Sequence, residues 1–142
     1  MNGNDKTRRL MWHGIFLFLL GLLTGLAVPA LTNPRMGVSA HLEGVLNGIF
    51  LIILGLIWRE LRLTPSAATA TFRIALYGTY ANWAATLLAA ILGTSRLTPQ
   101  AGAGYSAAVW QEVIVAFGQV SLVVAMLISC ILVLTGLSTN RK

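Results

Sequence analysis

Residues 39–48 place a histidine, a carboxylate and an amide inside an otherwise apolar sequence: His41, Glu43 and Asn47. An imidazole can ligate a metal or a cofactor, a carboxylate can carry a proton, and an amide can orient a substrate. At about 100° per residue, Glu43 and Asn47 lie one helical turn apart on the same face, and His41 points roughly the other way. The pattern predicts that His41 faces a neighbouring helix, subunit or cofactor, while Glu43 and Asn47 line a second surface.

Later apolar segments carry further polar candidates. Asn82 follows Tyr80 in an aromatic stretch, and an amide within an apolar helix needs a partner. Aromatic residues such as Tyr80 in a membrane helix more often pack against other helices or anchor the helix at the interface than contact a substrate. Glu112 and Gln119 are close to two helical turns apart, which predicts an inward polar stripe. A hydrated carboxylate near the surface explains Glu112 equally well.

Four long apolar segments must position these residues. The chain has 142 residues, of which 56% are hydrophobic and 10% charged, with a mean hydropathy of +0.77. A helix needs about 20 apolar residues to cross a bilayer. Only helices or closed barrels satisfy the backbone in lipid, and these segments are too long for barrel strands. We therefore predict an all-α integral membrane four-helix bundle forming one domain, residues 1–142, with helices near residues 10–31, 39–58, 71–92 and 107–137.

The basic residues predict the orientation, because Lys and Arg beside a spanning helix stay mostly on the cytoplasmic side. One face of the predicted bundle has only Arg35 and Arg96. The other face has Lys6, Arg8, Arg9, Arg59, Arg62, Arg73, Arg141 and Lys142. Both termini are therefore expected to be cytoplasmic. The formal charge of +6 indicates attraction to anionic lipid, and nucleic acid is not an expected partner.

Glycines recur at a spacing of four, as in Gly21 and Gly25 and again in Gly44 and Gly48. Small residues at this spacing let helix backbones approach closely, within one subunit or between subunits. A bundle of this size encloses little interior, which favours a homo-oligomer. The single cysteine, Cys130, excludes an internal disulfide and a cysteine-based metal cluster.

Three stretches of the sequence resemble the hydroxylaminobenzene mutases: residues 12–25, 33–48 and 80–83. The resemblance covers about two thirds of the chain. It implies a small enzyme of the bacterial inner membrane that takes part in nitroarene degradation. Such an enzyme converts hydroxylaminobenzene to 2-aminophenol by moving the hydroxyl from nitrogen to the ortho carbon.

A more distant similarity is to the styrene oxide isomerases, which rearrange an epoxide to an aldehyde. The shared residues are His41, the pair Asn47 and Gly48, and the pair Ala81 and Asn82. This resemblance implies a homotrimer with haem b held between subunits, His41 as the axial ligand, and iron acting as a Lewis acid. The chain departs from that family at two positions: Thr86 replaces a tyrosine and Gly78 replaces an aspartate. Substrate contacts are therefore expected to differ.

Together the two resemblances imply roles for the other site residues. Asn47 and Asn82 would orient the substrate, Tyr80 would stack on its aryl ring, and Glu43 would move the proton lost from the ring carbon. Three alternatives stay open. The chain could be an epoxide isomerase, a proton-coupled multidrug exporter using Glu43 or Glu112, or a scaffold subunit. Near the helix end, His41 could also serve as a cap rather than a ligand.

Overall fold

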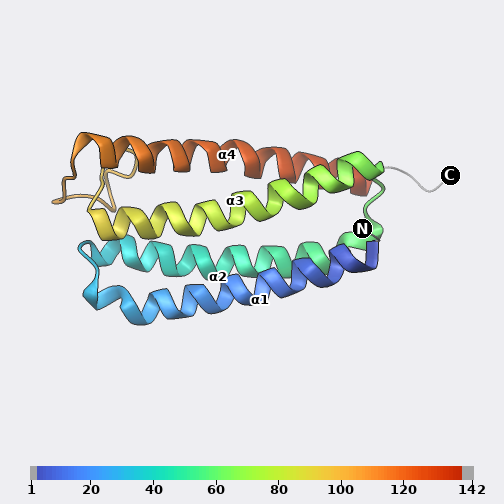
Figure 1. The fold of residues 1–142 in the computed structure, drawn as a ribbon, viewed down its shortest axis with the longest axis horizontal. Coiled ribbons are helices and arrows are strands. Elements are labelled where there is room, and N and C mark those ends of the chain that lie inside the picture. The colour runs from blue at the N-terminus through green and yellow to red at the C-terminus, as the bar shows by residue number, and fades with distance from the viewer. Residues whose placement is uncertain (1–2, 139–142) are drawn as a thin grey trace.

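The computed structural model describes residues 3–138 and contains four long helices and no strand within that range. The helices are α1 (Gly3–Ala27), α2 (Pro34–Ile57), α3 (Pro65–Leu92) and α4 (Val109–Ser138), as Figure 1 shows. Short 3-10 turns, η1 (Val28–Ala30) and η2 (Trp58–Glu60), follow α1 and α2. All four helices are long and apolar enough to cross a membrane. The predictions of an all-α fold and of four long apolar helices are confirmed.

Three helices begin earlier than the apolar pattern predicted. α1 begins at Gly3 rather than near Leu10, and capped prolines start the other two. α2 begins at Pro34 rather than near Ser39, and the Asn33 side chain accepts a hydrogen bond from the Met36 backbone. α3 begins at Pro65 rather than near residue 71, and Thr64 plays the same capping role. Proline suits the first helical position, since its missing N–H would have no partner there. α3 ends at Leu92 and is capped by Gly93, whose φ of 71° is readily adopted by glycine.

Close contact between α1 and α2 depends on glycines that face each other. A Cβ atom added to Gly44 would lie 2.5 Å from the Cα of Gly21, and one added to Gly14 would lie 2.7 Å from the Gly48 carbonyl oxygen. Side chains at these positions would force the two backbones apart. The recurring glycines therefore pack helices within one subunit.

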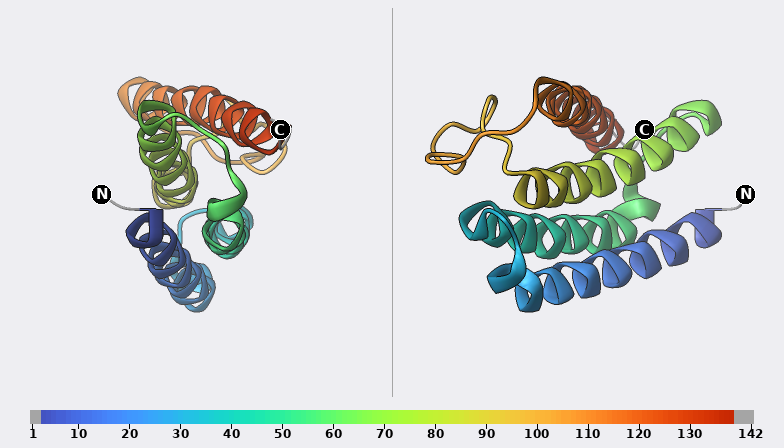
Figure 2. Two further views of the ribbon diagram at one scale, coloured as in Figure 1. Left: turned by 90° about the vertical axis from the view of Figure 1, so that its right-hand side faces the viewer. Right: turned by 60° about the vertical axis from the view of Figure 1, so that its left-hand side comes forward.

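The described helices form an open arrangement rather than a closed square. α1 packs mainly on α2, α2 on α3, and α3 on α4, and α4 makes no extended contact with α1 or α2. Figure 2 shows α4 resting on α3, away from α1. Much of the outer surface is apolar, as in Leu26 (81% exposed) and Phe117 (75% exposed).

Two apolar clusters fill the contacts between helices, and the polar residues lie between them. One cluster contains Leu51, Leu54 and Phe72. The other contains Met36 and Ala89. Along α2 and α3, Glu43, Asn47 and Asn82 fall between the clusters. The helices thus hold a polar layer between two apolar ones.

Basic side chains gather at one end of the structure. Figure 1 shows that the start of α1, the α2–α3 connection and the end of α4 lie together there. Lys6 donates a 3.0 Å hydrogen bond to Thr69 and lies 6.0 Å from the ring centre of Trp58. Arg35 and Arg96 lie at the opposite end, at the start of α2 and in the α3–α4 loop. Arg141 and Lys142 lie outside the described residues.

Candidate functional site

A carboxylate with two amide donors lies at the centre of the polar layer. Asn47 Nδ2 donates a 3.0 Å hydrogen bond to Glu43 Oε2 and a 2.8 Å bond to the Glu43 backbone carbonyl. Asn82 Nδ2, from α3, donates to the same carboxylate oxygen. Asn47 is only 6% exposed. The predicted shared face of Glu43 and Asn47 is confirmed, and α3 adds Asn82 to it.

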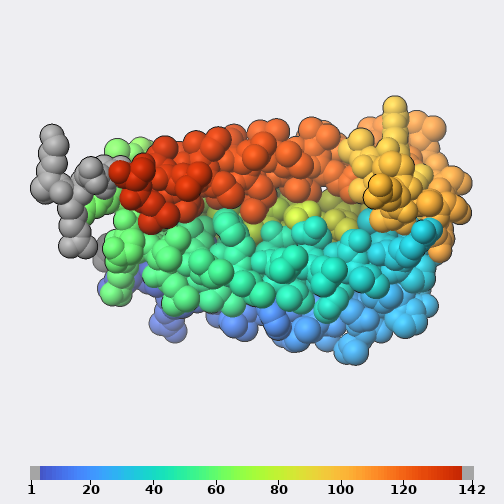
Figure 3. All heavy atoms as spheres, turned by 180° about the vertical axis from the view of Figure 1, so that it is seen from behind, coloured from blue at the N-terminus to red at the C-terminus, as the bar shows by residue number. Residues whose placement is uncertain are grey.

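This carboxylate opens on a groove between α2 and α4. The groove has a volume of about 450 Å³, which is in the range of small-molecule sites. Figure 3 shows the recess between α2 (teal) and α4 (orange to red), with α3 at its floor and the α3–α4 loop at one end. The lining residues are Met36, Ser39, Glu43, Asn82, Thr86, Leu97, Thr98, Ala101, Gln119, Val120, Leu122 and Val123. Most of the wall is apolar, so a ring can lie beside a few polar groups.

His41 lies apart from the groove, in the contact between α1 and α2. Its Nδ1 is 2.8 Å from the Gly21 carbonyl oxygen. A carbonyl oxygen only accepts hydrogen bonds, so Nδ1 carries the proton and Nε2 keeps a lone pair. Gly25 makes room for the ring, since a Cβ there would lie 2.8 Å from His41 Nδ1. The predicted separation of His41 from Glu43 and Asn47 is therefore observed.

The donor set fits a haem better than a bare metal ion. Nε2 of His41 has no hydrogen-bond partner among residues 3–138, and an imidazole oriented through its other nitrogen is a typical axial ligand. The described residues contain no group of three His, Cys, Asp or Glu side chains able to hold a metal ion. A metal bound at His41 would need ligands from elsewhere, as a porphyrin supplies.

Tyr80 does not join the groove. Its hydroxyl lies 3.1 Å from His13 Nδ1, and the two rings meet edge to face with centroids 5.8 Å apart. Positions 80 and 82 differ by about 200° around a helix, so when Asn82 faces Glu43, Tyr80 faces α1. The expectation that Tyr80 stacks on a substrate held by Asn82 does not fit this placement. Tyr80 instead joins α3 to α1.

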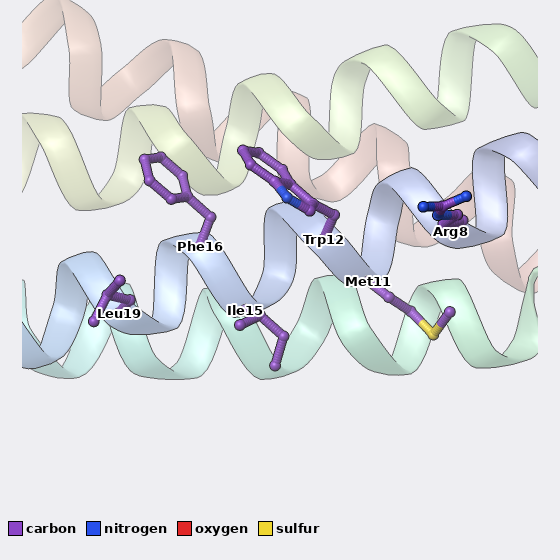
Figure 4. A pocket seen from close by; sticks show the side chains of 6 residues that line it. All are labelled: Arg8, Met11, Trp12, Ile15, Phe16 and Leu19. Carbon is purple, nitrogen blue, oxygen red and sulfur yellow. The ribbon is translucent and has the colours of Figure 1, made fainter.

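A second hollow lies on the outer face of α1 and is a weaker candidate. Its volume is about 440 Å³. Trp12 and Phe16 stack along it with ring centroids 5.2 Å apart. Figure 4 shows that all its lining side chains come from this one helix: Arg8, Met11, Trp12, Ile15, Phe16 and Leu19. The polar groups among these lining residues, the Arg8 guanidinium and the Trp12 indole N–H, come from one helix, so nothing there could orient a reacting atom from two sides.

The end wall of the groove is the loop of residues 93–108, which is held by hydrogen bonds to Glu112 on one side and to Asn33 on the other. Glu112 accepts hydrogen bonds from the backbone N–H groups of Ser95 (2.9 Å) and Arg96 (3.1 Å). Asn33 donates a 2.9 Å bond to the Ala101 carbonyl. The predicted inward stripe is thus divided: Gln119 lines the groove, whereas Glu112 fastens the loop.

Replacing Glu112 with alanine is expected to speed tryptic cleavage after Arg96 by about tenfold or more, since hydrogen bonds to a charged group contribute about 1.5–3 kcal/mol each. Cleavage of the detergent-purified protein would be followed by mass spectrometry. Glu60→Ala, an exposed change at the other end of the structure, is the control and should leave this rate unchanged. Equal cleavage rates in the Glu112→Ala variant and the unmodified protein would contradict the role of Glu112 in holding the loop.

Comparison with known proteins finds similarity over most of the chain. The family model described as styrene oxide isomerase matches residues 6–138. The chain is 53% identical over 131 residues to hydroxylaminobenzene mutase HabB of Ectopseudomonas oleovorans, covering 92% of this chain and 80% of that protein. It is 46% identical over 125 residues to hydroxylaminobenzene mutase HabA of the same organism, covering 87% and 93%. No solved structure is significantly similar.

Proposed function

This chain belongs to the styrene oxide isomerase family and is an isomerase, and we propose that it rearranges arylhydroxylamines such as hydroxylaminobenzene to 2-aminophenols by intramolecular hydroxyl transfer. Two mutase relatives, at 53% and 46% identity, support this reaction over epoxide isomerisation. The structural observation that carries the proposal is the Glu43 carboxylate, held by two amides at the edge of an apolar groove. Both relatives are named as mutases, which favours an isomerase over an exporter.

The reaction needs no co-substrate, because its product is an isomer of its substrate. The N–O bond breaks, a C–O bond forms at the ortho carbon, and the proton lost from that carbon is balanced by one gained at nitrogen. The fragment formed after N–O cleavage is electron-poor, so a nearby carboxylate stabilises it and can accept the ring proton. Glu43 is the group we assign to both tasks.

The amides and the apolar wall complete this assignment. Asn47 and Asn82 hold Glu43 Oε2 in one place, which leaves the other oxygen of this groove-lining carboxylate without a partner among residues 3–138. A carboxylate fixed before the reaction does not have to reorient as charge develops. Apolar side chains such as Leu122 and Val123 restrict water, which would otherwise attack the electron-poor ring at other positions.

We also propose haem b as the cofactor, with His41 Nε2 as its ligand; bound there, it would supply a Lewis acid for the substrate oxygen. His41 and the groove lie on different sides of α2, so a single copy does not bring them together. That separation supports the proposal of a homotrimer in which neighbouring copies complete the site.

We further propose that the chain is a multi-pass protein of the bacterial inner membrane with both termini in the cytoplasm. Four helices of suitable length and hydropathy support insertion in the lipid bilayer. The gathering of basic residues at the end that holds the start of α1 and the α2–α3 connection supports the orientation.

The test is to incubate detergent-purified protein with hydroxylaminobenzene in isotopically labelled water and to analyse the products by chromatography and mass spectrometry. We expect 2-aminophenol without labelled oxygen, because the hydroxyl moves within one molecule. Labelled product would contradict intramolecular transfer. Conversion of styrene oxide, with no 2-aminophenol formed, would show that the chain is an epoxide isomerase instead.

A further inference from the structure

Gln119 is a polar side chain of α4 that the reaction outlined above does not use. It lines the groove and has no hydrogen-bond partner among residues 3–138. The polar side chains nearest to it on the same helix have hydrogen-bond partners. Gln111 accepts from the Ala108 backbone, Glu112 fastens the loop, and Ser121 bonds Tyr77 at 2.7 Å. An unpaired amide on an apolar helix is costly, so its position in the groove indicates that a ligand pairs with it.

Glu43 has the same kind of unused capacity. Both amide donors bond its Oε2 atom, and Oε1 has no partner in the described part of the chain. Beside the Asn82 amide and the hydroxyls of Ser39, Thr86 and Thr98, the groove is therefore lined by a carboxylate on α2 with one unused oxygen and by a carboxamide on α4. A carboxylate only accepts hydrogen bonds, whereas a carboxamide both accepts and donates.

We propose that Gln119 is a specificity-determining residue, which together with Glu43 recognises the N–H and O–H hydrogens of an arylhydroxylamine and discriminates against epoxides. The inference rests on the proposed function. An arylhydroxylamine has two hydrogen-bond donors, its N–H and its O–H, which match two acceptors, Glu43 Oε1 and the carboxamide oxygen of Gln119. An epoxide brings only an oxygen that accepts, so it would leave Glu43 Oε1 unpaired. A site built to pair with donors strongly rejects an analogue that lacks them.

The variant that tests this is Gln119→Met, because methionine keeps the length and flexibility of the side chain and is compatible with an apolar helix. We expect the KM for hydroxylaminobenzene to rise about tenfold to hundredfold, with a smaller change in kcat, since the lost contact binds the substrate before it reacts. Inhibition by styrene oxide should stay the same or strengthen. Ser121→Ala, on the same helix but paired with Tyr77 outside the groove, is the matched control and should keep both constants.

A second measurement needs no variant. In the unmodified protein, aniline, which carries N–H donors, should inhibit turnover at least about tenfold more strongly than styrene oxide does. Equal inhibition by the two, or an unchanged KM in a well-folded Gln119→Met protein, would overturn the role of Gln119 while leaving the mutase reaction intact. Absence of any hydroxylaminobenzene turnover in the unmodified protein would instead overturn the proposed function and this inference with it.

Discussion

Replacing His41 with alanine is expected to remove haem absorbance and to lower mutase activity by at least about hundredfold, because the variant loses the imidazole proposed to hold the cofactor. The Gly21 carbonyl fixes the proton on Nδ1, so that Nε2 alone can ligate iron. The measurement is the Soret band of the purified protein, recorded alongside the rate of 2-aminophenol formation.

The second histidine provides the control. His13 bonds Tyr80 between α1 and α3 and lies outside the groove. His13→Phe should keep the Soret band and most of the activity, because phenylalanine retains the edge-to-face contact with Tyr80. If His41→Ala kept both its colour and its activity, the assignment of His41 as ligand would be wrong.

The sequence predicted the features that depend on one segment at a time. Helical periodicity alone places Glu43 and Asn47 on one face and His41 on another, and the structure has them so. Unbroken apolar segments predicted four helices, because in lipid a helix satisfies its backbone N–H and C=O groups within one segment, whereas a strand needs neighbouring strands. The predicted first residues of the helices were less accurate. The apolar pattern places the starts of two helices near residues 39 and 71, whereas Pro34 and Pro65 occupy the first helical positions.

Features that depend on how helices pack against each other could not be predicted in this way. The bond from Asn82 to Glu43 requires a particular rotation of α3 against α2, and that same rotation turns Tyr80 toward His13. The sequence indicates Gln119 only as part of a stripe with Glu112. The stripe divides because Glu112 reaches the loop backbone at the end of α4, while Gln119 lies where α4 borders the groove.

Substituting Glu43 with glutamine is expected to lower kcat by about 10²- to 10⁴-fold, the usual contribution of a general base. Glutamine has the same shape, and its carbonyl oxygen can still accept from Asn47 and Asn82. The fold should therefore survive while the proton acceptor is lost. The measurement is kcat at saturating hydroxylaminobenzene. Glu60→Gln, an exposed change at the basic end, is the matched control and should leave kcat unchanged.

Combining substitutions separates the proton acceptor from the residues that hold it. Asn82→Ala alone should lower kcat less than Glu43→Gln does, because Asn47 still holds the carboxylate. If Asn82 acts only through Glu43, adding Asn82→Ala to Glu43→Gln should cost little more, since residues that work as a unit are not additive. A fully additive double variant would mean that Asn82 contacts the substrate on its own. A Glu43→Gln protein with kcat within about threefold of the original would place the proton acceptor elsewhere.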